Sequence, residues 1–292
     1  MGLTPAHEAR RKRYLGASDV PAVLGVSPFK TAADVYYAKT SEFESSNEKV
    51  PDAIRSGNLL EVSVLDFAQD QVGKIKRNQF RVHPELKWAS ATMDGVLVGK
   101  NEGVEAKTTS KTDDWGEEGT DQIPLTYLAQ TQWQMYVTGF DRVWVPVLMP
   151  DFVLKFKLYV VERDQDIIDS MVQTCTVFWE SNVMAGVCPE GCLPAQRTLK
   201  RLKRVPSKVT EVDRKLVQLY EKARKASIET KRVEKEARVR LIQALGDAEV
   251  GTYNGGHVEY SLRTRKGVGD NPDTNYRMLK VKESHNGSTE KA

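Results

Sequence analysis

The sequence predicts a mixed α/β protein with a central mixed sheet flanked by helices, followed by a long helix and a β-hairpin. Amphipathic helical segments alternate with short β-rich runs as far as residue 183. A stretch rich in proline, glycine and basic residues then spans residues 186–206. Beyond it, small or apolar residues recur at spacings of four and three. We therefore expect two domains, residues 1–193 and a basic extension over residues 194–292.

Helices in the first domain are predicted from apolar periodicity and from end signals. They are expected at residues 18–25, 31–39, 59–72, 127–137 and 164–183. Ser18 is the expected N-cap of the first helix, with Pro21 in its first turn, and Thr31 is the expected cap of the second. Gly73 ends the third.

Strands are predicted where β-forming residues lie between turn signals. They are expected at residues 80–82, 91–93, 96–98, 103–109, 141–148 and 154–161. In the extension, a helix over about residues 210–245 precedes a hairpin over residues 246–266. We expect residues 271–292 to be loosely ordered and the last ten to be disordered.

Charge is unevenly distributed along the 292 residues, whose net charge is +3. From Arg197 onward there are 23 basic and 13 acidic residues, so the preceding part has a charge of −7. A basic segment suits nucleic acid or an acidic protein surface, although a solvated charged helix fits equally well. No apolar run is long enough to span a membrane. Three cysteines cannot all pair within one chain, which favours a reducing cytoplasm.

The most informative segment for chemistry extends from Asp94 to Lys107. Asp94 is expected between a short strand and a turn, and Glu105 and Lys107 alternate on the next strand, so their side chains leave the same face. If the two strands pair, all three side chains meet at one end of the sheet. Two carboxylates suit a hard cation such as Mg²⁺, and an ammonium can orient a water or stabilise a charged phosphate. Glu-x-Lys alone is a weak signal that also fits a solvated strand face.

Several further motifs occur in order along the chain. Arg11 lies seven residues before Ser18, Glu61 ends the run Gly-Asn-Leu-Leu-Glu, and Gln130 ends Tyr-Leu-Ala-Gln. Together with Asp94, Glu105 and Lys107, and with the stretch 159–164, these residues resemble the YqaJ-type viral recombinases. That family is related to the phage lambda exonuclease within the PD-(D/E)xK nuclease superfamily. The resemblance spans residues 11–183 and implies a restriction-endonuclease-like core.

The resemblance also implies a role for each matching residue. Asp94 and Glu105 are similar to direct metal ligands, with the backbone carbonyl of Ala106 as a third. Glu61 matches the residue that binds a second metal ion, and Lys107 matches the residue that positions the attacking water. The implied cofactor is Mg²⁺, for which Mn²⁺ can substitute.

The other matching residues bind the substrate in the family. Gln130 resembles the helix residue that holds the water or the scissile phosphate. Arg11 and Ser18 resemble the clamp on a terminal 5′-phosphate, with Arg13 as a rival to Arg11. Met93 replaces the proline that commonly precedes the first aspartate. No iron–sulfur cluster is expected, because the sequence lacks a fourth cysteine.

The function implied by the resemblance is degradation of one strand of duplex DNA from its end, 5′ to 3′. The resulting 3′ overhang would pass to a single-strand annealing protein. The family also implies a homo-oligomeric ring, commonly a trimer, in the cytoplasm of a bacterial host. Two alternatives remain open: an endonuclease of the same fold, and a non-catalytic DNA-binding or assembly protein.

Overall fold

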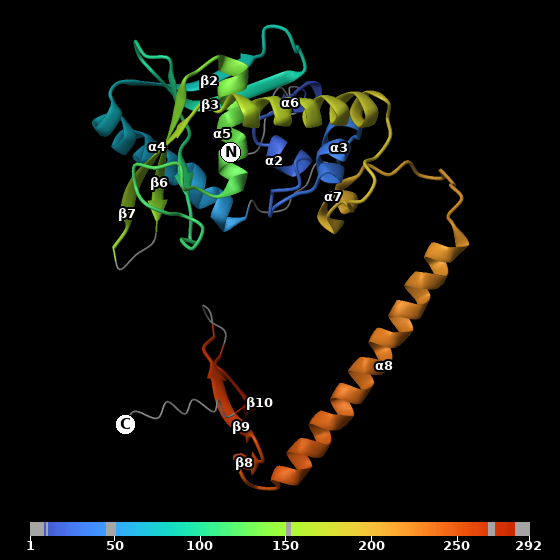
Figure 1. Cartoon of the computed structure of the whole chain (residues 1–292). Helices are drawn as coiled ribbons and strands as arrows, with labels where there is room; N and C mark the ends of the chain where they lie inside the picture. Colours follow the sequence, from blue (N-terminus) through green and yellow to red (C-terminus); the bar gives the residue numbers. More distant parts are fainter. Residues whose placement is uncertain (1–8, 10, 45–50, 150–152, 268–271, 284–292) are drawn as a thin grey trace. The chain divides into compact units, whose positions relative to one another are not determined.

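The structure is a computed structural model that describes residues 9, 11–44, 51–149, 153–267 and 272–283. The chain divides into two compact units, residues 1–205 and residues 206–292, and each is considered by itself (Figure 1). Among the described residues, none of the helices combines the length and apolar character needed to cross a bilayer.

The first unit is built on a seven-stranded mixed sheet. Its strands are β1 (Leu15–Gly16), β2 (Ile75–Val82), β3 (Ala89–Leu97), β4 (Glu102–Val104), β5 (Lys107–Thr108), β6 (Arg142–Met149) and β7 (Lys155–Glu162). Both β4 and β5 pair in parallel with β6, whereas β3 pairs antiparallel with β2 and β4. The mixed sheet that the sequence predicts is therefore confirmed.

Helices cover both faces of this sheet (Figure 1). The helices of this unit are α2 (Val20–Val23), α3 (Ala32–Thr40), α4 (Asp52–Val72), α5 (Leu125–Thr138), α6 (Gln165–Phe178), the π-helix η1 (Trp179–Met184) and α7 (Gln196–Arg201). Alternation along β6 separates the two faces, because Val143 and Val145 pack in the cluster that includes Met135 of α5, whereas Trp144 packs in the cluster that includes Leu65 of α4. The region between α4 and α5 is where the chemistry-bearing residues gather.

Two expectations about the central strands were wrong. β3 is one continuous strand through Asp94, and the turn follows at residues 98–101 instead of at Asp94. The strand expected at residues 103–109 is interrupted between β4 and β5, at Glu105 and Ala106. The register places Ala106 opposite Pro146 of β6, and proline has no N–H to donate to a neighbouring strand. This proline explains the interruption.

The start of the first helix also differs from the prediction. Thr31 caps α3 with a reciprocal capping box, as expected. Ser18, however, is not an N-cap: α2 has only four residues, its N-cap is Asp19, and no side chain caps it. The Asp19 carboxylate instead binds Lys30 at 2.5 Å and Lys39 at 2.6 Å. A tertiary interaction therefore uses the side chain that could have capped the helix.

The C-terminal part contains more regular structure than expected. Residues 196–201, within the expected linker, form α7, and residues 274–283, within the region expected to be loose, form a strand. The second unit contains α8 (Arg214–Leu245) and an antiparallel sheet of β8 (Val250–Tyr253), β9 (Gly256–Arg265) and β10 (Thr274–Glu283). The predicted hairpin is β8 and β9, and β10 extends it because Tyr276 and Met278 alternate with polar residues. The expected disorder at residues 284–292 lies outside the described residues.

Candidate active site

Four of the side chains named from the sequence line one pocket of about 310 Å³. They are Glu61, Asp94, Glu105 and Lys107. Ala106 also lines this pocket, together with other residues of α4 and β5 and with Tyr127 of α5. The structure therefore brings together residues that lie up to 46 positions apart, and we call this space the carboxylate pocket.

The β3–β4 hairpin places the two central acids side by side. Gly95 pairs with Val104, the last residue of β4, so Asp94 lies next to Glu105, which follows it. The Ala106 N–H donates to Asp94 Oδ2 at 2.9 Å, and the Glu105 N–H donates to the Trp144 carbonyl at 2.9 Å. The interruption between β4 and β5 thus leaves one backbone N–H available to fix the first carboxylate.

A close approach between α4 and β5 brings in the third acid. A Cβ at Gly57 would lie 3.4 Å from Thr108 Oγ1, an ordinary van der Waals distance, so this turn of α4 lies directly beside β5. Glu61 lies four residues later on the same face of α4 and is partly buried. This packing explains how a helical carboxylate reaches the pocket formed by the strands.

Glu105, Lys107 and Gln130 form a closed triangle of polar contacts. The Lys107 ammonium lies 2.5 Å from Glu105 Oε1 and 3.2 Å from Gln130 Oε1. The Gln130 Nε2 group donates to the same Glu105 oxygen at 2.5 Å. Lys107 Nζ also lies 4.9 Å from the centre of the Tyr127 ring, a cation–π contact. The position of the ammonium is therefore determined by three neighbours.

Gln134 is a site residue that the sequence interpretation left unexplained. It is fully buried on α5, and its Nε2 donates to Glu105 Oε2 at 2.6 Å and to the Thr92 carbonyl at 3.2 Å. Its Oε1 has no hydrogen-bond partner among the described residues. The spacing of four residues from Gln130 could have revealed it, because i and i+4 share a helix face.

The charges in the pocket change the proton affinities of its groups. Burial raises the pKa of Asp94 well above its usual range, and the negative charges of Glu105 and Glu61 add to this effect. Burial and the charge of Glu105 likewise raise the pKa of Glu61. Burial alone would lower the pKa of Lys107, but Glu105 and Asp94 outweigh it and raise that pKa. Lys107 is therefore a cation at neutral pH.

The donor chemistry of the carboxylate pocket fits a hard divalent cation. Three carboxylates converge, and the pKa values of Asp94 and Glu61 are raised by burial and by the neighbouring acids, a repulsion that a bound cation would relieve. As placed, no set of three or more Asp, Glu, His or Cys side chains within the described residues has the arrangement of a metal shell. The Lys107 ammonium contacts one carboxylate oxygen of Glu105, Oε1. This contact is one reason why the three carboxylates do not form a metal shell.

The residues expected to bind a terminal phosphate lie in another part of the first unit. The Arg11 carbonyl accepts a hydrogen bond from Lys39 Nζ at 2.7 Å, and Lys39 also binds Asp19, the residue after Ser18. Arg13 lies instead over the ring of its neighbour Tyr14, at 5.5 Å. A four-residue helix supplies little dipole, so the helix-based argument for anion binding at Ser18 is not supported. The cations beside Ser18 are Lys30 and Lys39, and both bind the carboxylate of Asp19.

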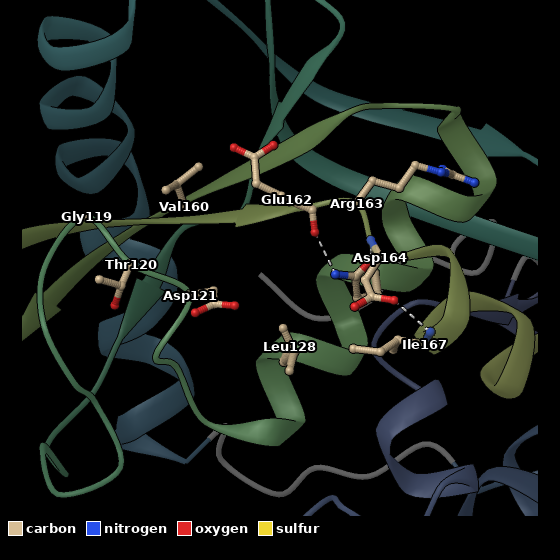
Figure 2. A pocket seen from close by; sticks show the side chains of 10 residues that line it. Gly119, Thr120, Asp121, Leu128, Val160, Glu162, Arg163, Asp164 and Ile167 are labelled. Carbon is tan, nitrogen blue, oxygen red and sulfur yellow. Dashed lines mark hydrogen bonds between the residues drawn. The ribbon is translucent and has the colours of Figure 1, made fainter.

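A second pocket of about 370 Å³ lies between β7, α5 and the start of α6 (Figure 2). Gln132 is buried beneath it, donates to the Glu162 carbonyl at 2.8 Å and accepts from the Asp164 N–H at 3.0 Å. Asp164 caps α6 by accepting from the Ile167 N–H, as Figure 2 shows. Gln132 therefore joins α5 to the turn before α6, which assigns it a structural role.

Known proteins resemble this chain in sequence. Residues 7–141 match the YqaJ-like viral recombinase domain. The "Uncharacterized protein YqaJ" of Bacillus subtilis (strain 168) is 28% identical over 254 residues, which cover 82% of this chain and 78% of that protein. The alignment therefore extends beyond residue 205 into the second unit.

One solved structure is similar in fold to this chain over more than half of its length. The alkaline exonuclease LHK-Exo from Laribacter hongkongensis superposes with a TM-score of 0.50 at 19% identity, covering 63% of this chain and 94% of that one. A phage-related exonuclease from Haemophilus somnus 129PT gives a TM-score of 0.45 at 14% identity, covering 59% and 94%. Residues 7–141 of this chain are therefore similar to the YqaJ-like viral recombinase domain, and the chain shares the fold of the alkaline exonuclease LHK-Exo.

Proposed function

We propose that this protein is a metal-dependent deoxyribonuclease whose active site is the carboxylate pocket. The convergence of Glu61, Asp94, Glu105 and Lys107 in one pocket carries the proposal. The matching recombinase domain and the exonuclease-like fold support it. A pocket with three acids and one protonated lysine combines groups for binding a cation with a group for binding a phosphate oxygen.

We assign the metal-binding roles to the carboxylates. Asp94, Glu105 and the Ala106 carbonyl would hold the first Mg²⁺ or Mn²⁺ ion, and Glu61 would hold or orient a second. When bound, the cation supplies Lewis-acid activation of water and neutralises charge on the phosphate. The Ala106 N–H keeps Asp94 oriented by its hydrogen bond to Oδ2, so the other oxygen, Oδ1, is the one available to the pocket.

Lys107 acts as a hydrogen-bond donor in this proposal. Its raised pKa keeps it protonated, so it donates to the attacking water or to a phosphate oxygen and does not accept the water's proton. Gln130 holds the ammonium through its Oε1 and holds Glu105 through its Nε2. Attack by water in line with the leaving group breaks the P–O3′ bond, leaving a 3′-hydroxyl on one product and a 5′-phosphate on the other.

The direction of digestion follows from the family resemblance. We propose 5′-to-3′ resection of one strand of a duplex end, with Arg11 and Ser18 binding the terminal 5′-phosphate. The backbone carbonyl of Arg11 is held by Lys39, which also binds Asp19 next to Ser18, whereas the Arg13 guanidinium lies over the Tyr14 ring; this supports Arg11 over Arg13. An arginine fork and nearby lysines suit a phosphate.

Assembly and partners are also proposed from the family. We propose a ring of identical subunits, a trimer by resemblance, that works in the cytoplasm and passes its 3′ overhang to a single-strand annealing protein. We further propose that residues 1–193 carry the nuclease and that residues 194–292 contact DNA or a partner. The 32-residue helix α8 supports this role, since none of its residues is buried within the chain.

The test is digestion of linear duplex DNA labelled at either end, with and without a 5′-phosphate, in Mg²⁺ and in chelator. The parent protein should release label from the 5′-phosphorylated end in Mg²⁺ only. Glu105→Gln and Lys107→Ala should each lower the rate at least ~100-fold. Matched controls are Glu117→Gln and Lys111→Ala, exposed positions outside the pocket, which should retain the parent rate.

A covalently closed circle separates the alternatives. An exonuclease leaves the circle intact, whereas cleavage of it would indicate an endonuclease of the same fold. If linear DNA survives in Mg²⁺ and in Mn²⁺, the protein is a non-catalytic binding or assembly protein. Full activity of Glu105→Gln would contradict the assignment of the pocket.

A further inference from the structure

Five cationic side chains follow one another on α7 and the turn after it. We call them the α7 basic segment, and they are Arg197, Lys200, Arg201, Lys203 and Arg204. All five are exposed. No acidic residue occurs anywhere between positions 191 and 210. Half of the +10 charge found from Arg197 onward therefore belongs to this short segment, which is part of the first unit.

The segment is fixed to the first unit by hydrogen bonds at both ends. At its start, the Ala195 N–H donates to Asp34 Oδ1 at 2.8 Å. At its end, the Arg201 carbonyl accepts from the Glu44 N–H at 2.9 Å, and the Lys203 N–H donates to the Glu42 carbonyl at 2.9 Å. These bonds hold the cations in a defined place, which a flexible linker would not do.

The positive charge of this segment is largely uncompensated. Lys203 pairs with Glu42 at 3.1 Å. The other four cations contact no carboxylate among the described residues: two guanidinium groups donate to backbone carbonyls, and Arg201 lies 5.2 Å over the ring of Phe43. Contacts with carbonyls and rings orient a guanidinium without cancelling its charge. A partner with regularly spaced negative charges could neutralise these four cations.

Basic residues from the N-terminal segment lie beside this surface. Glu42 and Glu44, whose backbone groups bond to residues 203 and 201, lie just beyond the end of α3 at Thr40. The Arg11 carbonyl accepts a hydrogen bond from Lys39, which is near the same end of α3. The α7 basic segment and the proposed 5′-phosphate clamp are therefore near each other.

We propose that the α7 basic segment contacts the phosphate backbone of the duplex DNA whose end enters the carboxylate pocket. The inference rests on the proposed function, because it assumes that the first unit binds a DNA end. Residues 1–196 have a net charge of −7, so a positive surface here would orient a polyanion on a unit that otherwise repels it. An acidic protein is the competing partner, and the experiment distinguishes the two.

The experiment measures binding of a fluorescent duplex by the full chain in chelator, from 50 to 200 mM salt. The variant reverses three cations: Lys200→Glu, Arg201→Glu and Arg204→Glu. Each phosphate contact contributes about 0.9 to the slope of log affinity against log salt. The variant's slope should therefore be smaller by about 2 to 3, and the loss of affinity across this salt range should be roughly 40-fold less than for the parent.

The matched control reverses three exposed lysines near β2, with Lys74→Glu, Lys76→Glu and Lys100→Glu. Its slope should change by less than about 1, since these lysines are not assigned to the DNA surface. If altered tryptophan fluorescence shows that the glutamate variant is misfolded, the triple variant with glutamine at positions 200, 201 and 204 is measured in its place. Its slope of log affinity against log salt should be smaller than the parent's by the same amount.

An unchanged slope in the α7 variants, or an equal fall in the control, would overturn the proposal. A parent that binds no duplex at 50 mM salt would also overturn it, in favour of an acidic protein partner. Hydrolysis by the parent in Mg²⁺ is measured in parallel. An active parent with an unchanged slope refutes this inference alone, whereas an inactive parent with an α7-dependent slope refutes the proposed function alone.

Discussion

Replacing Asp19 with asparagine should destabilise the first unit, because Asp19 is the only carboxylate among the described residues that pairs with the buried Lys39. The Lys39 side chain is 2% exposed, and its ammonium lies 2.6 Å from Asp19 Oδ2. Lys30 binds the other carboxylate oxygen at 2.5 Å. The asparagine amide could accept one hydrogen bond but would carry no charge, so Lys39 would become a buried cation without a counter-ion.

The expected magnitude follows from the burial of this pair. Removing one partner of a buried ion pair costs about 3–5 kcal/mol, and the remaining hydrogen bond to the Arg11 carbonyl places Asp19→Asn at about 3 kcal/mol. The deficit should depend on pH. Burial already lowers the pKa of Lys39, and loss of Asp19 lowers it further. The unfolded chain then binds more protons than the folded chain, so stability rises with pH and the deficit shrinks between pH 7 and pH 10.

Urea unfolding followed by tryptophan fluorescence measures this effect, because all five tryptophans lie in the first unit. The matched control is Asp66→Asn, whose carboxylate is 59% exposed and pairs with Arg77 at the surface. It should cost less than about 1 kcal/mol. A loss below about 1 kcal/mol for Asp19→Asn, unchanged from pH 7 to pH 10, would refute the reasoning.

Three further outcomes are expected. Gln134→Leu should weaken Mn²⁺ binding by about 10- to 100-fold in calorimetry, because Glu105 Oε2 loses the donor that orients it; parent-like affinity would exclude that role. Cys175 should resist a thiol reagent in the folded protein, since burial raises its pKa to about 12; mass spectrometry of the labelled peptide checks this, and rapid labelling would contradict it. Gly95→Ala should cost about 1–3 kcal/mol in urea unfolding, because its Cβ would lie 2.4 Å from Ile75 Cγ2; an unchanged midpoint would show that the site relaxes freely.

The acidic centre was accessible from the sequence because its geometry is local. Asp94 lies on β3, which pairs with β4, and Glu105 and Lys107 follow directly after the end of β4. Hairpin pairing and a spacing of two residues are therefore enough to bring the three side chains together. Glu61 and Gln130 were named only through the family resemblance, since their approach depends on how α4 and α5 pack. Nothing in a single helix reveals such packing.

Other features depend on contacts distant in sequence and were missed. Ser18 and Asp19 are both good cap residues, and only the positions of Lys30 and Lys39 determine what Asp19 does. The basic composition of residues 196–201 hides a helix that is anchored by Asp34, more than 160 residues away. In β10, alternating charged residues reduce the apolar signal, and pairing with β9 determines the strand.

The most direct test of the central claim is the anomalous scattering of Mn²⁺ in crystals of the full chain. The proposed nuclease centre predicts a peak bound by Asp94, Glu105 and the Ala106 carbonyl, with Lys107 displaced from Glu105. Asp94→Asn crystals should lose or weaken that peak. Absence of manganese from the carboxylate pocket at millimolar concentration, with the Lys107–Glu105 pair intact, would contradict the account.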